Sequence, residues 1–99
     1  MNINLNREIP NYKEGVVKDE KGKPVIMRDI IVMSLNSVGS NEDWSKDEKI
    51  KAYELSLRLM SKDNVDLSID EMKYILDCVG QVTSPLVIGT LNKWFEQKE

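Results

Sequence analysis

The chain has 99 residues, of which 40% are apolar and 31% charged, and it carries a net charge of −3 at neutral pH with a pI near 5.0. Because it contains no histidine and a single cysteine, Cys78, the sequence excludes an internal disulfide, a His/Cys zinc site and the Ser–His or Cys–His pairs of nucleophilic enzymes. We therefore expect a non-enzymatic protein with no cofactor and no metal, folded as a single domain over residues 1–99.

The distribution of apolar and charged residues indicates a protein that stays in the cytoplasm. No apolar run approaches the roughly 18–20 residues of a membrane span, and the first ten residues lack the apolar centre of a signal peptide. Residues 1–28 carry six lysines and arginines against four acids, whereas residues 29–99 carry eight against thirteen. This mild, mixed-sign charge lacks the clustered basic face of a nucleic-acid-binding protein, so it disfavours nucleic acid as a partner.

The first 27 residues predict a β-hairpin or an extended arm. Two short β-branched runs, at residues 16–17 and 25–27, flank the charged segment 18–24, which ends in Gly-Lys-Pro and therefore has the chemistry of a turn. An isolated hairpin is only marginally stable in water. We therefore expect this arm to pack on the helical part of the chain, residues 28–99.

Helical periodicity from residue 28 onward predicts a compact bundle of about four helices. The first covers residues 28–38 and stops at Gly39, although its β-branched content leaves a strand as the alternative. The second and third begin at S-x-x-E capping boxes and the fourth at a Ser-Pro pair, which are typical helix starts. The expected bounds are Ser45 to about Ser61, Ser68 to Gly80, and Ser84 onward. The predicted fold class is thus α+β, mainly α.

The second helix is predicted to be apolar on two opposed faces. At about 100° per residue, one face holds Ile50, Tyr53, Leu57 and Met60, and the other holds Ala52, Leu55 and Leu59. A helix that is apolar around most of its circumference is buried or shared with another chain. Since a four-helix domain does not readily cover so many apolar faces, we expect the protein to bind a protein partner or to self-associate.

Two features that invite a chemical role have structural explanations. The acids between Asp63 and Glu71 lack the ligand spacing and the glycine of a calcium loop, and they surround a capped helix start, where the helix dipole favours negative charge. Cys78 lies near the end of the third helix beside Asp77, which disfavours a thiolate, so we expect an unreactive, partly buried cysteine. The five glycines form neither a P-loop nor a dinucleotide-binding loop.

Six residues are candidates for an interaction surface, and they are Trp44, Trp94, Gly89, Lys18, Lys21 and Lys23. The two tryptophans are chosen because tryptophan is a typical interface anchor, although aromatic residues at helical spacing are more often core. The glycine lies on the polar face of the fourth helix, where it costs about 1 kcal/mol relative to alanine, and it is either simply tolerated there or marks a close approach by the hairpin or by another chain. The lysines lie at the predicted hairpin tip, which either contacts a partner or is simply a solvated turn.

Five short segments are spread over most of the chain: DEKGKP at residues 19–24, DEK at 47–49, YEL at 53–55, VDLS at 65–68 and SPLVIG at 84–89. In this order the segments resemble small proteins of tailed bacteriophages and prophages. The resemblance implies a phage or prophage source and a location in the bacterial cytoplasm. It does not imply any enzymatic activity. We therefore expect a protein that binds a host or phage protein, alone or as a homo-oligomer. The alternative is a nucleic-acid-binding accessory protein that uses the lysine-rich hairpin.

Overall fold

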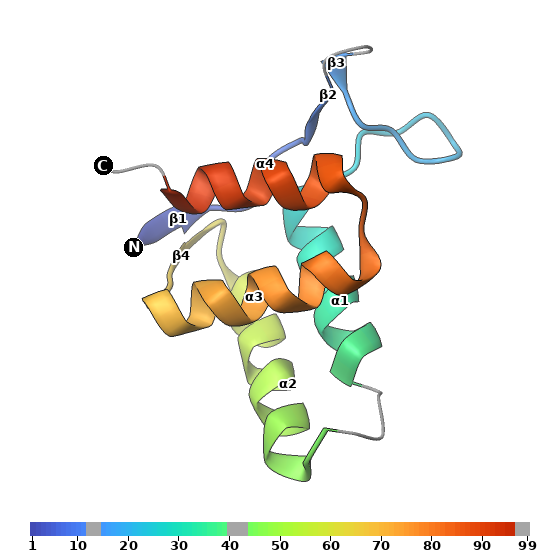
Figure 1. Ribbon diagram of the computed structural model, residues 1–99. Helices are drawn as coiled ribbons and strands as arrows, with labels where there is room; N and C mark the ends of the chain where they lie inside the picture. The colour runs from blue at the N-terminus through green and yellow to red at the C-terminus, as the bar shows by residue number, and fades with distance from the viewer. Residues whose placement is uncertain (12–14, 40–43, 97–99) are drawn as a thin grey trace.

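The computed structural model describes residues 1–11, 15–39 and 44–96, and within these ranges four helices are accompanied by two small sheets of two strands each (Figure 1). In chain order the elements are β1 (Asn2–Asn4), β2 (Pro10–Asn11), β3 (Gly15–Val16), α1 (Met27–Gly39), α2 (Lys46–Ser61), β4 (Asn64–Asp66), α3 (Ile69–Val82) and α4 (Pro85–Glu96). The predicted α+β class, mainly α, is confirmed. The β-branched segment after residue 27 forms a helix and not a strand.

Serine caps determine where α2 and α3 begin. At Ser68 the predicted capping box is complete, because its hydroxyl accepts a hydrogen bond from the Glu71 N–H at 3.1 Å and the Glu71 carboxylate accepts one from the Ser68 N–H at 2.9 Å. At Ser45 the hydroxyl accepts from the Glu48 N–H at 3.2 Å, but the Glu48 carboxylate accepts from that same hydroxyl, at 3.3 Å. The box at the start of α2 is therefore only half formed.

The end of α3 differs from the prediction. Gly80 does not stop the helix, which continues to Val82 and is followed by Thr83, whose N–H and hydroxyl both donate to the Val79 carbonyl, at 3.0 and 2.7 Å. Gly80 lacks the positive φ of a helix-ending glycine. A Cβ placed on it would lie 3.8 Å from the Ile88 side chain, so this glycine lies where α4 packs on α3.

The N-terminal arm contains a hairpin, but its sheet uses a different partner from the one predicted. β3 pairs in antiparallel fashion with β2, which precedes it in the chain. The chain then doubles back as predicted, because the Val25 N–H donates to the Val17 carbonyl at 2.9 Å and Gly22, at φ +81°, lies in the turn between them. The expected pairing of residues 16–17 with 25–27 is limited to this bond and one neighbouring bridge, since Ile26 instead bridges Glu8 and the Met27 N–H donates to the Arg7 carbonyl at 2.9 Å.

β1 and β4 are not among the predicted elements, and they pair with each other in antiparallel fashion (Figure 1). Ile3 lies opposite Val65, and both side chains are buried. The Met1 ammonium donates to the Leu67 carbonyl at 2.7 Å and to the Asp66 carboxylate at 3.2 Å. The beginning of the chain is thereby attached to the link between α2 and α3.

The core lies where one face of each helix meets the N-terminal segment. α1 packs against both α2 and α3, and α4 packs against α3. The buried apolar side chains are Ile3, Leu5, Ile9, Met27, Ile31, Leu35, Ala52, Leu55, Leu59, Val65, Leu67, Ile75, Cys78, Val79, Val87, Leu91 and Trp94. None of the helices in the described ranges has the length and hydropathy that a bilayer crossing needs. In the same ranges, no group of three or more acidic, histidine or cysteine side chains is placed to hold a metal ion.

Candidate functional site

α2 exposes a stripe of four apolar side chains, which we call the outer face. Its members are Ile50, Tyr53, Leu57 and Met60, with exposed fractions of 44%, 60%, 52% and 51%. On the other side of the same helix Ala52, Leu55 and Leu59 are buried in the core. Separations of three and four residues place the members of the outer face next to one another along the helix. Of the two apolar faces predicted for this helix, the protein therefore buries one and leaves the other half open to solvent.

Charged side chains border the outer face. Lys49 and Glu54 are both exposed, and neither forms an ion pair with a residue that the structure describes. Two other charged residues of α2 contact α3 instead. The Lys51 ammonium lies 5.1 Å from the centre of the Tyr74 ring, and Arg58 forms an ion pair with Glu71. The outer face is thus an apolar stripe with a cation on one border and an acid on the other.

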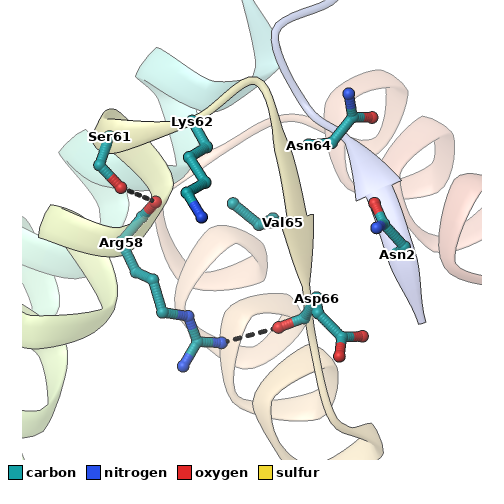
Figure 2. A pocket seen from close by; sticks show the side chains of 7 residues that line it. All are labelled: Asn2, Arg58, Ser61, Lys62, Asn64, Val65 and Asp66. Atoms are coloured by element: carbon teal, nitrogen blue, oxygen red, sulfur yellow. Dashed lines mark hydrogen bonds between the residues drawn. The ribbon is translucent and has the colours of Figure 1, made fainter.

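Arg58, near the C-terminal end of α2, ties this helix to β4 and α3. Its Nη2 atom lies 2.8 Å from a Glu71 carboxylate oxygen and donates to the Asp66 carbonyl at 2.9 Å. The Ser61 hydroxyl donates to the Arg58 carbonyl at 2.9 Å (Figure 2). The hydrogen bond from Arg58 holds the pKa of Glu71 below its ordinary value, although partial burial opposes this. The Arg58 guanidinium therefore connects α2 to both β4 and α3.

Replacing Arg58 with leucine is expected to lower the free energy of unfolding by about 1–2 kcal/mol at neutral pH, because the variant loses the ion pair and the bond to β4 but keeps an apolar stem. Since the pKa of Glu71 is lowered in the folded protein, its contribution is present above the unfolded pKa and is lost as the pH falls through the folded pKa. Urea denaturation should therefore show a smaller difference near pH 3 than at pH 7. Arg58→Lys, which keeps the charge without the planar fork, should be intermediate, and a difference independent of pH would argue against the Glu71 pair.

Two clefts share Arg58 as part of their lining. The larger, about 400 Å³, is formed by Asn2, Arg58, Ser61, Lys62, Asn64, Val65 and Asp66 (Figure 2). The smaller, about 230 Å³, is formed by Lys51, Glu54, Leu55, Arg58 and Glu71. Ligand sites are usually lined mainly by apolar and aromatic residues with a few convergent polar groups, whereas these linings consist mostly of charged and polar residues of both signs, with one apolar residue each. We therefore assign no small-molecule site to either cleft.

The two tryptophans proposed as interface anchors lie in different surroundings. Trp94, in α4, is 5% exposed and belongs to the core, and the Arg7 guanidinium carbon lies 4.0 Å from the centre of its ring. Trp44, just before α2, is half-buried and contacts Tyr74 of α3, with ring centres 5.6 Å apart. Trp94 is therefore covered within the chain, and Trp44 retains only part of its surface for a partner.

The glycine and the lysines proposed for the interaction surface are all exposed. A Cβ placed on Gly89 would meet nothing within 4 Å, so neither the hairpin nor any other described segment approaches it. Lys18, Lys21 and Lys23 are brought together on the loop that projects from the helical part (Figure 1). The Asp19 carboxylate in this loop accepts hydrogen bonds from the N–H groups of Lys21 and Lys23, at 2.9 and 3.0 Å. The lysine loop therefore contains an acid at its centre.

The two weakly acidic groups of α3 stay protonated at neutral pH. Cys78 is 1% exposed, more deeply buried than predicted, and burial together with Asp77 raises the pKa of its thiol to about 11. Burial also raises the pKa of the Tyr74 phenol to about 12, and its hydroxyl has no hydrogen-bond partner among the described residues. Neither group offers a nucleophile near pH 7.

The outer face is composed of residues whose spacing predicts that they lie on one side of a helix, and none of them is among the six predicted interaction residues. The available signal was their spacing, together with the second apolar face behind them. Comparison with protein-family models, with curated proteins and with solved structures finds no match to this chain.

Proposed function

We propose that this chain is a small phage- or prophage-encoded, non-enzymatic protein that acts by protein–protein contact through the outer face of α2. One observation carries the proposal: four neighbouring apolar side chains on one helix are each about half exposed, while the other face of that helix is buried. Contiguous exposed apolar stripes with polar borders are typical of protein interaction sites. The phage source rests on the resemblance of the sequence segments.

The size of the outer face favours a reversible contact. Completing the burial of four half-exposed apolar side chains contributes about 1 kcal/mol for each. Association itself costs several kcal/mol in lost rotational and translational freedom. Further favourable contacts must therefore come from the bordering charges and from the surface next to α2.

Photo-cross-linking tests this proposal in the cell. We expect the photoreactive residue p-benzoylphenylalanine, placed at Tyr53, to form a covalent adduct with a protein. The same residue placed at Lys93, which is exposed on α4, should form no such adduct. Mass spectrometry of the adduct identifies the partner, whether a second copy or another protein. No adduct at Tyr53, or equal adducts at both positions, would contradict the proposal.

Nucleic-acid binding through the lysine loop is the alternative. Three lysines on one exposed loop support it, but Asp19 and Glu20 lie in the same loop and reduce its positive potential. Nucleic-acid-binding proteins carry a broader basic surface than this. The loop therefore supports the alternative less strongly than the outer face supports protein contact.

A further inference from the structure

We infer that the partner of the outer face is the same face of a second copy, and that the two α2 helices lie side by side in parallel. This inference rests on the proposed function, because it names the occupant of the surface proposed above. Two features of α2 carry it. The first is the spacing of its exposed apolar side chains, and the second is the position of the charges that border them.

The outer face has the spacing of a two-stranded coiled coil. In heptad notation (abcdefg), Ile50 and Leu57 occupy a positions, and Tyr53 and Met60 occupy d positions. In a parallel pair each of these side chains packs against its own counterpart in the other helix. The core buries positions c, f and g of the same helix, occupied by Ala52 and Leu59, Leu55, and Ser56, and leaves the a and d positions open.

The bordering charges are complementary when the pair is parallel. Lys49 occupies a g position, and Glu54 occupies the e position five residues later. In a parallel pair a g side chain meets the e side chain of the partner's next heptad, so Lys49 meets the second copy's Glu54. Two-fold symmetry forms this contact twice. Because neither side chain has an ion-pair partner among the described residues of its own chain, both are available for this contact.

An antiparallel pair with the same apolar stripe is disfavoured by the same charges. In that arrangement e positions face e positions and g positions face g positions. The Glu54 carboxylates of the two copies would then face each other close to the two-fold axis. Lys49 would face no acid, since the other g position of the helix is Ser56. The parallel arrangement replaces this repulsion with two attractions, and charges at these positions are known to set helix orientation.

Disulfide cross-linking distinguishes the two arrangements. Ile50→Cys and Met60→Cys each place one thiol in the outer face, and the native Cys78 is buried and does not compete. In a parallel pair each variant alone forms a covalent dimer, because counterpart residues lie within disulfide reach. In an antiparallel pair the two copies of residue 60 are separated by ten residues along the axis, roughly 15 Å, and only a mixture of both variants cross-links. Lys93→Cys on α4 is the control for random collision, and we expect it to cross-link at least about tenfold more slowly.

Charge reversal tests the same contact without a covalent bond. Lys49→Glu and Glu54→Lys should each raise the dimer Kd about tenfold, measured by analytical ultracentrifugation. An equimolar mixture of the two variants should recover association as a heterodimer, because both contacts then join opposite charges. Lys93→Glu makes the same change of charge as Lys49→Glu on a distant helix and should leave the Kd unchanged.

Each contrary outcome points to a different error. Cross-linking only in the mixture of cysteine variants, or a dimer Kd unaffected by charge reversal, overturns the parallel arrangement. A chain that sediments as a monomer at every concentration, while the photoreactive residue at Tyr53 captures a different protein, overturns the second copy and leaves the proposed function intact. Absence of any adduct at Tyr53 overturns the proposed function itself.

Discussion

Replacement of Trp94 by alanine is expected to lower the free energy of unfolding by about 3–5 kcal/mol, the cost of removing a large buried aromatic side chain. The indole is 5% exposed, so the substitution opens a cavity in the core beside α4. It also removes the ring beneath the Arg7 guanidinium, a contact worth about 0.5–1 kcal/mol at an exposed site. Since small domains are stable by only about 5–15 kcal/mol, this single change should bring the protein close to unfolding at room temperature.

Urea denaturation followed by far-UV circular dichroism measures this loss without relying on tryptophan fluorescence. Trp44→Ala is the matched control, because Trp44 is only half-buried and contacts the Tyr74 ring. It should cost about 1–2 kcal/mol. Equal losses for the two substitutions would mean that Trp94 does not belong to the core.

Replacement of Leu5 by alanine is expected to cost about 2–5 kcal/mol, as for other fully buried leucines. Leu5 is 1% exposed although it precedes every helix, because the residues around it lie against the start of α1, where the Arg28 N–H donates to the Leu5 carbonyl at 2.9 Å. That backbone bond is unaffected by the substitution, so the loss reports on side-chain packing alone. The midpoint of urea denaturation gives the measurement.

Asn2→Ala provides the comparison for Leu5→Ala within the same segment. The Asn2 side chain is exposed, and its removal should change stability by no more than about 0.5 kcal/mol. If Leu5→Ala were as well tolerated as Asn2→Ala, the N-terminal segment would not be part of the core.

The helices could be predicted from the sequence because their signals are local. Ser68 and Glu71 are three residues apart and form the complete capping box that their spacing predicts. Pro85 begins α4 because the first helical position needs no N–H. Gly80 shows the limit of such reasoning. Its position near a helix end predicts a stop, but whether a glycine stops a helix or accommodates a neighbouring one depends on where α4 packs.

β1 and β4 could not be predicted because their pairing is not local. β4 consists of Val65 between Asn64 and Asp66, two residue types that are rare in strands. β1 likewise places Ile3 between two asparagines. Neither segment has the length or alternation of an independent strand. Each becomes a strand only because the other lies beside it, and no signal within either segment indicates its partner.

The residues of the outer face can be grouped from the sequence, but their exposure to solvent cannot be predicted from it. Periodicity predicts that Leu55 and Leu57 lie on different sides of α2, and the structure confirms it, with exposed fractions of 4% and 52%. Periodicity does not indicate which side the other helices cover. The same limit applies to the tryptophans, because the spacing that places Trp94 on an apolar face is the same for a covered face and an open one.

The pairing of β1 with β4 joins segments that are distant in the chain, so we expect it to form late in folding. The Met1 ammonium and the Asp66 carboxylate are in contact although they lie 65 positions apart in the chain. Helices form from neighbouring residues within microseconds, whereas contacts between distant residues must first overcome the entropy of closing a long loop. Because the pairing of Ile3 with Val65 closes such a loop, we expect β1 to dock only after the helices have formed when the chain refolds.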